Sequence, residues 1–224
     1  MYLYLILNIA SLSIPLIYSF DKKMRFIRHW RAVLLSLVII ASVFLLWDAV
    51  FTKNGVWGFN PKYHLNCTLL GMPIEEWLFF FCIPYASIFI HYSFEYFKPN
   101  LLLSKHVTQA ITIGLILTLI PVIIVHTDKD YTYVNYSALV FLLAISLKYG
   151  IKYLQRFYIA FLAILIPFFI VNGILTGIRL DEPIVWYNDE ENLGIRIATI
   201  PVEDIGYAFT MIFGNIFLIE KFKK

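Results

Sequence analysis

The sequence predicts an all-α integral membrane protein, with seven transmembrane helices in a 3+1+3 parallel-repeat arrangement. Three observations lead to this fold class: the composition, seven long apolar stretches, and polar motifs that recur 128 residues apart. The 224 residues are 60% hydrophobic and 15% charged, whereas a soluble domain is roughly 45–50% apolar and about 25% charged. This composition excludes a soluble globule, a disordered chain, a collagen-like chain and a nucleic-acid-binding domain.

Each of the seven stretches is close to the length of about 20 apolar residues that a membrane-crossing helix needs. They cover Tyr2–Ser19, Ala32–Phe51, Pro73–Phe94, His106–His126, Tyr133–Gly150, Phe157–Ile178 and Thr199–Glu220. Helices are expected because backbone groups in lipid must be hydrogen-bonded within the segment, and the apolar runs lack the alternation of a membrane β-barrel. The first stretch is interpreted as a retained span, since its Lys and Arg residues follow it rather than precede it.

The Lys and Arg residues predict how the helices are oriented in the membrane. The loops on one side carry only five of the 18, namely Lys53, Lys62, Lys129, Arg179 and Arg196. The loops on the other side and the C-terminal tail carry the remaining 13. Cytoplasmic loops hold the excess of positive residues. The N-terminus is therefore expected outside, and the C-terminus in the cytoplasm.

The sequence matches itself when it is shifted by 128 residues. Residues 59–80 align with residues 187–208, so that Pro-x-Glu-Glu at 73–76 falls on Pro-x-Glu-Asp at 201–204. Four spans separate equivalent helices, so both repeats have the same topology, and a pseudo-two-fold axis is expected along the membrane normal. The expected units are a first three-helix repeat at 1–97, a connector helix at 98–130 and a second three-helix repeat at 131–224.

Four acidic residues stand where the third and seventh spans begin: Glu75, Glu76, Glu203 and Asp204. Ionisable residues within spans are costly and mark functional sites, although an acidic residue after a proline is also an ordinary helix start. The repeat favours Glu75 and Glu203 as a pair that faces one shared cavity. Asp48, at the outer end of the second span, adds a fifth carboxyl group. Crowded carboxyl groups cannot easily all ionise, so an acid and a base side by side are expected, which suits proton-transfer catalysis.

Other polar and aromatic residues lie near these acids in the sequence. Asn60 and Asn188 are candidates to hydrogen-bond the carboxyl groups or to form turns, and Arg196 to pair with an acid or to remain a loop charge. Aromatic rings are candidates to stabilise a cation or simply to pack; they are Trp47, Trp57, Phe59, Trp77, Phe79, Trp186, Tyr187 and Tyr207. Scattered histidines and two cysteines form no metal signature, and no nucleotide-binding motif is present, so neither a metal nor a cofactor is expected.

The paired acidic motifs and their surroundings resemble the membrane-integral lycopene cyclase family. The motifs are Trp-Asp at 47–48, Gly-x-Trp-x-Phe-Asn-Pro at 55–61, Pro-x-Glu-Glu at 73–76, Phe-Phe-x-x-Pro-Tyr at 80–85, Trp-Tyr-Asn at 186–188 and Gly-x-Arg-x-x-Thr-Ile-Pro at 194–201, which runs into Pro-x-Glu-Asp at 201–204. In that family the two halves occur as separate subunits in some bacteria. They are fused in other bacteria, in archaea and in the cyclase portion of fungal bifunctional enzymes.

The resemblance implies a lycopene β-cyclase, an isomerase that closes the ends of linear lycopene into β-ionone rings, giving γ-carotene and then β-carotene. It implies catalytic roles for Glu75 and Glu203, joined by Glu76 and Asp204. The substrate is a lipid-soluble carotenoid, so the enzyme is expected in the cell membrane of a prokaryote, with no nucleic-acid partner. The reaction moves no electrons and chemically needs no redox cofactor. Which carboxyl is the acid, the oligomeric state and any association with other carotenoid-pathway enzymes stay open.

Three alternatives remain at this point. One lies within the family, namely cyclisation of another linear carotenoid or formation of an ε or γ ring. A small parallel-repeat transporter would suit the architecture, but few polar side chains in the spans could line a path for a hydrophilic solute. A retinal-binding photoreceptor would need a lysine in the last span, and residues 200–219 contain none.

The expected orientation can be tested with a reporter enzyme that is active only in the periplasm. Fused after Lys224, the reporter is expected to stay silent, because the positively charged tail remains in the cytoplasm. A cytoplasm-active reporter at the same position is the control and is expected to be active. The opposite pair of results would invert the topology.

Overall fold

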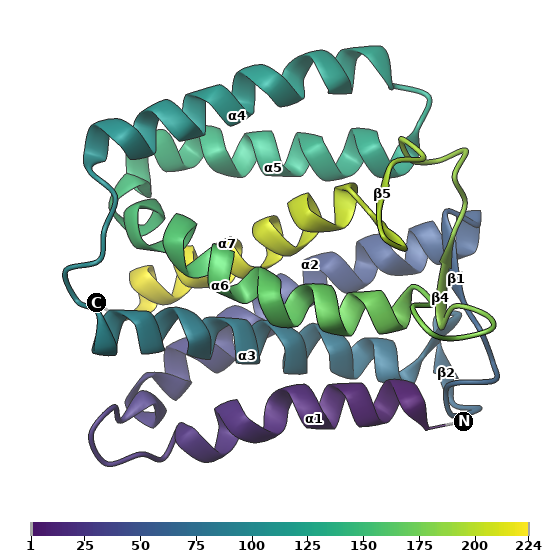
Figure 1. The fold of residues 1–224 in the computed structure, drawn as a ribbon, viewed down its shortest axis with the longest axis horizontal. Coiled ribbons are helices and arrows are strands. Elements are labelled where there is room, and N and C mark those ends of the chain that lie inside the picture. The colour runs from purple at the N-terminus through teal and green to yellow at the C-terminus, as the bar shows by residue number, and fades with distance from the viewer. Residues whose placement is uncertain (1, 224) are drawn as a thin grey trace.

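Seven helices run side by side in the computed structural model, which describes residues 2–223, and short strands gather at one end of them (Figure 1). The helices are α1 (Leu3–Tyr18), α2 (Trp30–Asn54), α3 (Ile74–Phe97), α4 (Lys105–Val125), α5 (Asp130–Tyr149), α6 (Ile151–Leu175) and α7 (Glu203–Phe222), with a short 3-10 helix at Phe26–His29. The strands are β1 (Trp57–Phe59), β2 (Thr68–Leu69), β3 (Met72–Pro73), β4 (Val185–Tyr187), β5 (Arg196–Ile197) and β6 (Ile200–Pro201).

Five helices in the described chain are long and apolar enough to cross a membrane: α2 with the 3-10 turn before it, α3, α4, α6 and α7. They confirm the all-helical, membrane-type fold class. Helix α1 is apolar but has only 16 residues, about 24 Å of helix against a hydrocarbon layer of about 30 Å. Helix α5 has 20 residues and buries polar side chains such as Thr132 and Asn135. For α1 and α5 a full crossing stays a prediction.

Two helices, α6 and α7, begin farthest from the expected residues. Helix α6 begins at Ile151 rather than Phe157, and α7 begins at Glu203 rather than Thr199. Before α7 the chain forms a hairpin in which β5 pairs with β6, and its turn places Ala198 at a φ of 56°. The equivalent hairpin of β2 and β3 precedes α3. Strands of two residues each carry no periodic signal, so the sequence pattern did not predict them.

Helices α3 and α7 form the middle of the bundle. Helix α1 packs on α3, α5 packs on α7, α2 lies against both central helices, and α6 lies mainly against α3 (Figure 1). Phe157 on α6 packs against Phe209 and Phe213 on α7, with ring centroids 4.9 and 5.0 Å apart. Helix α4 lies at the edge of the bundle, where it packs on α5 and α6. Only 11% of its most apolar stretch is buried inside the protein. Its outer face is therefore left for lipid.

The antiparallel strands β1 and β4 join the two halves of the chain at one end of the bundle. Gly58 pairs with Trp186, and these two residues are 128 positions apart. A side chain at Gly58 has no space, because a Cβ atom there would lie 2.3 Å from the Trp186 indole. The indole therefore covers the strand pair directly over the glycine.

This close approach predicts that Gly58→Ala destabilises the fold by about 1–3 kcal/mol, as overpacking does elsewhere. Thermal unfolding of the purified protein in detergent would measure the change. Gly114→Ala is the matched control, since nothing lies within 4 Å of a Cβ at that position. Adding Trp186→Ala to Gly58→Ala is expected to recover most of the loss; an unchanged melting temperature in Gly58→Ala would contradict the packing.

Candidate active site

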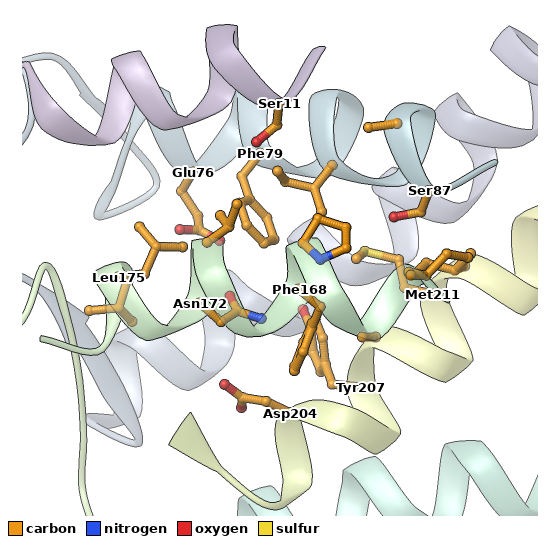
Figure 2. Close-up of a pocket in the computed structure, with 18 of the residues that line it drawn as sticks. Ser11, Glu76, Phe79, Ser87, Phe168, Asn172, Leu175, Asp204, Tyr207 and Met211 are labelled. Atoms are coloured by element: carbon orange, nitrogen blue, oxygen red, sulfur yellow. The ribbon is translucent and has the colours of Figure 1, made fainter. Parts of the chain in front are cut away.

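A cavity of about 330 Å³ lies inside the bundle, with walls from α1, α3, α6 and α7. This volume is at the small end of the range for ligand pockets, about 300–1,000 Å³. Most of the wall is apolar, including Ile83, Ile164, Phe168 and Met211. Figure 2 shows these walls and the polar groups between them.

Three carboxyl groups line the end of this cavity nearest the strands: Asp48 from α2, Glu76 from α3 and Asp204 from α7. Their residues are 2%, 8% and 6% exposed, respectively. Glu76 and Asp204 approach the cavity from opposite walls (Figure 2). Asp48 and Glu76 are neighbours at this end of the cavity, and two neighbouring carboxyl groups do not easily both ionise.

Each cavity carboxyl accepts a hydrogen bond from an aromatic side chain on another element. The hydroxyl of Tyr4 donates to Glu76, and the hydroxyl of Tyr131 donates to Asp204 at 2.5 Å. The indole of Trp57 donates to Asp48 at 2.5 Å. Donors of this kind offset the cost of taking a carboxyl group out of water.

Asp204 accepts a second hydrogen bond, at 3.1 Å, from the phenol hydroxyl of Tyr187 on β4. Burial and the neighbouring Asp204 raise the pKa of Tyr187 well above its ordinary value, so this hydroxyl stays protonated and donates at neutral pH. The two phenols donate to different oxygens of the Asp204 carboxyl group, so both oxygens are hydrogen-bonded.

Glu75 and Glu203, which the repeat favoured as the catalytic pair, are not among the residues that line the cavity. Both are fully buried, and each accepts the backbone N–H of the loop ten residues before it, from Leu65 at 2.7 Å and Leu193 at 2.8 Å. Glu203 also accepts the hydroxyl of Thr132 at 2.7 Å. The expectation that these two glutamates face one shared cavity is therefore wrong.

The physical reason is helix geometry. Successive residues of a helix point about 100° apart, so the two acids of each motif face different surroundings. Both acids of the first motif have an equivalent 128 residues later, so the repeat does not indicate which acid of each motif faces the cavity. The first acid binds the loop behind the helix, and the second, Glu76 or Asp204, points inward.

Asn60 and Asn188 lie in turns and do not contact the cavity carboxyl groups. The Asn60 side chain accepts the N–H of Lys62 at 3.0 Å and donates to Glu182 at 2.9 Å. The Asn188 side chain accepts the N–H of Glu190 at 3.1 Å. Of the two roles considered for these asparagines, the structure shows the turn role, which Asn side chains fulfil by bonding their own backbone two residues on.

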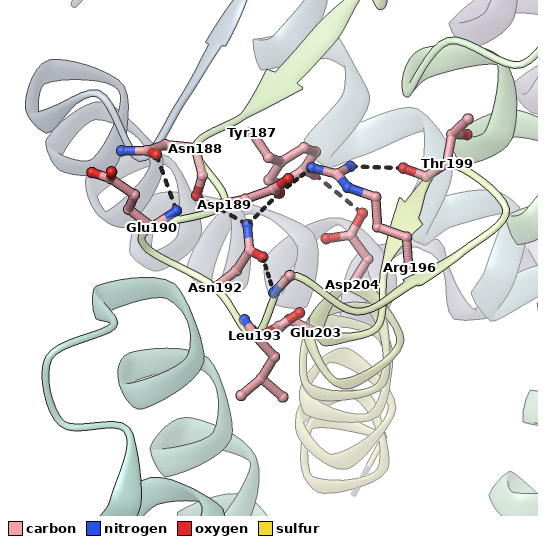
Figure 3. Close-up of polar contacts among 11 residues, drawn as sticks. Tyr187, Asn188, Asp189, Glu190, Asn192, Leu193, Arg196, Thr199, Glu203 and Asp204 are labelled. Carbon is pink, nitrogen blue, oxygen red and sulfur yellow. Dashed lines mark hydrogen bonds and ion pairs between the residues drawn. The ribbon is translucent and has the colours of Figure 1, made fainter.

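Arg196 pairs with an acid, but the acid is Asp189 in the same loop. The guanidinium lies 2.5 Å from the Asp189 carboxylate and donates to the carbonyl of Thr199 at 2.8 Å (Figure 3). Its hydrogen bond lowers the pKa of Asp189. The pair orders the loop between β4 and β5, above the helix that carries Asp204.

The aromatic candidates divide into two groups. Five line the cavity beside the carboxyl groups: Trp57, Phe59, Phe79, Tyr187 and Tyr207. The other three are absent from its walls: Trp47 packs against Tyr207 at 5.1 Å between ring centroids, Trp77 donates to the carbonyl of Leu69, and Trp186 covers Gly58.

Several residues of the site had no signal in the motifs. Tyr4, Tyr131 and Asn172 line the cavity, and Asn8 and Asn135 donate to the backbone carbonyls of the buried glutamates. The only available signal was that Tyr4 and Asn8 recur as Tyr131 and Asn135, 127 positions later. Within residues 2–223, no three His, Cys, Asp or Glu residues are grouped as metal ligands.

Fold and site together define an apolar-helix membrane protein with carboxyl groups at one end of an internal cavity. The family model described as lycopene cyclase matches residues 1–94 and residues 128–222. The chain belongs to the lycopene cyclase family, and carotenoid cyclisation is the class of reaction this membership supports. The two matched segments leave out α4. No curated protein and no solved structure matches the chain.

The contact between Thr132 and Glu203 predicts a structural role for both. Thr132→Val removes the hydroxyl and leaves a buried carboxyl with one donor fewer, so stability is expected to fall by about 1–3 kcal/mol. Thermal unfolding in detergent would measure it. Thr118→Val on the exposed side of α4 is the control, because that hydroxyl donates only to its own helix at Gly114. Equal melting temperatures for the two variants would refute the role.

Proposed function

We propose that the protein closes the ends of linear lycopene into β-ionone rings, forming γ-carotene and then β-carotene. The observation that carries the proposal is the placement of three carboxyl groups at one end of a largely apolar cavity. The substrate is a hydrocarbon dissolved in the bilayer, and an apolar cavity within membrane-type helices suits it. The reaction is an isomerisation, since the atoms of lycopene and of its product are the same.

The acid in this proposal is the pair formed by Asp48 and Glu76. Two neighbouring carboxyl groups keep one proton between them more easily than they both ionise, and Glu76 faces the cavity. This proton is transferred to the terminal C1=C2 double bond of the substrate, which leaves a tertiary cation at C1. The C5=C6 double bond attacks that cation, and the six-membered ring closes.

The base in this proposal is Asp204. Phenol donors from Tyr131 and Tyr187 favour its ionised form, and it stands across the cavity from Glu76 (Figure 2). It removes a proton from C6, which places the double bond of the β ring. Glu75 and Glu203 act as positioning residues, because they bind the loops that precede α3 and α7.

Aromatic rings complete the proposed site. Trp57, Phe59 and Phe79 line the cavity on the side of the carboxyl groups. Their faces stabilise a cation without attacking it. Exclusion of water by the same rings protects the cation from hydration.

The 3+1+3 arrangement belongs to the same proposal, with units at 1–97, 98–130 and 131–224 and the N-terminus outside. Equivalent contacts at matching positions support it. Asn8 donates to the carbonyl of Glu75 as Asn135 donates to that of Glu203, and the matched family segments also begin and end at corresponding residues of the two halves. The pseudo-two-fold axis of this arrangement would pass between Gly58 and Trp186, the middle of the three residue pairs that join β1 to β4.

The first experiment is expression of the chain alone in bacterial cells that accumulate lycopene, followed by chromatography and mass spectrometry of the pigments. New pigments with β-ring absorption and unchanged mass are expected. Rings of another type would assign the reaction to a different carotenoid cyclase. Unchanged lycopene, with the protein detected in the membrane, would refute the proposal.

Variants then separate the two acids of each motif. Glu76→Gln and Asp204→Asn are expected to lose roughly 10²–10⁴-fold in turnover, the usual contribution of a general acid or base, with little change in melting temperature. Glu75→Gln and Glu203→Gln are the matched controls on the neighbouring helix positions, and they are expected to lower the melting temperature more than the turnover of the folded fraction. The reverse pattern would return the catalytic roles to Glu75 and Glu203.

A further inference from the structure

The cavity is a slot that runs along the helices rather than a round pocket. On α3 its lining extends from Glu76 at the strand end to Ile90, roughly 20 Å along the helix at about 1.5 Å per residue. The carboxyl groups stand at one end only, and the rest of the wall is mostly apolar, with the neutral polar side chains of Ser11, Ser87 and Asn172 between the apolar ones (Figure 2). This shape suits a linear hydrocarbon that lies along the helices with its terminus at the carboxyl groups.

The slot reaches the lipid-facing side of the bundle between α1 and α6. Ala10 and Ile14 of α1 line it and are nevertheless exposed, Ile14 by 65%. Helix α1 packs mainly on α3. Near the strands its Leu7 packs in one apolar cluster with Leu175 and Val171 of α6, and farther from the strands Ile14 of α1 and Pro167 of α6 form the edge of the slot. Apolar side chains that are exposed on a membrane-type helix face lipid, so this edge connects the slot to the bilayer.

Entry from the aqueous end is blocked. Trp57 and Phe59 on β1 and Tyr187 on β4 form the wall of the slot at that end. They lie on paired strands, and Trp57 and Tyr187 also hold the carboxyl groups. A side entrance between helices is the route that leaves these contacts intact.

The corresponding space in the other half of the molecule is filled. Asn172 and Leu175 line the slot on α6, and the residues 128 positions before them on α2 are Phe44 and Trp47. Both rings pack on Tyr207, with centroids 4.9 and 5.1 Å away. The smaller side chains of Asn172 and Leu175 on α6 thus leave space for the slot, whereas the rings at the equivalent positions of α2 fill the corresponding space.

We propose that a linear carotenoid enters from the bilayer between α1 and α6, one end at a time, while the remainder of the molecule stays in lipid; this inference rests on the proposed cyclase function. The cavity volume of about 330 Å³ is that of a pocket for a small ligand, and a whole carotenoid is larger. Each ring therefore requires a separate entry of one end through the same opening.

The test places a bulky ring at the opening. Ile14→Trp and Val171→Trp are expected to lower kcat/KM for lycopene in reconstituted membranes by at least about tenfold, with a melting temperature close to that of the wild type. Val43→Trp is the matched control, because Val43 is the residue 128 positions before Val171, is 58% exposed and lies outside the slot. Its kcat/KM is expected to be unchanged. Wild-type kinetics in Ile14→Trp and Val171→Trp, or an equal loss in Val43→Trp, would overturn the proposal.

A binding measurement separates this inference from the proposed reaction. In a Glu76→Gln background, the amount of lycopene that co-purifies with the protein is expected to fall with Ile14→Trp and not with Val43→Trp. If the wild type forms no ring but lycopene retention still depends on Ile14, the entrance holds and the cyclase function fails. If rings form but Ile14→Trp and Val171→Trp change neither the retained lycopene nor kcat/KM, the proposed entrance is wrong and the cyclase function stands.

Discussion

The burial of three carboxyl groups within an apolar helix bundle is the constraint on which the rest of the structure depends. A carboxyl group in such surroundings is costly unless donors reach it. The donors come from elements far apart in the chain: Tyr4 on α1, Trp57 on β1 and Tyr131 on α5. Each donor ties a peripheral element to α2, α3 or α7, so the satisfaction of these acids also sets where the outer helices and strands lie.

The two successive acids at the start of α3, and those at the start of α7, make different contacts. The first holds the preceding loop through a backbone N–H, as Glu75 does with Leu65 and Glu203 with Leu193. The second faces the cavity. Because the first acid fixes the loop and the start of the helix, it also determines the direction in which the second one points. The two acids of each motif therefore have different surroundings, although they are adjacent in the chain.

Much of the architecture could be predicted from the sequence, because long apolar runs and acidic helix starts are local signals. The helical class and the family followed from them, and so did the set of acids that contains Asp48, Glu76 and Asp204. Which acid of each motif lines the cavity could not be predicted, because side-chain direction depends on the hairpin that sets the first turn. Tyr4 and Tyr131 were missed because each meets its acid across more than 70 residues of chain, and no local pattern records such a contact.

The pairing of β1 with β4 has a consequence for biosynthesis. Strand β4 leaves the ribosome about 128 residues after β1, a delay on the order of 10 s at ordinary rates of synthesis. Until then Asp48 and Glu76 sit in an incomplete bundle that lacks Tyr187 and the facing wall of α7. The late strand closes the cavity, and its Tyr187 donates to Asp204 of the helix that follows it, so the site is complete only after the second acidic motif has emerged.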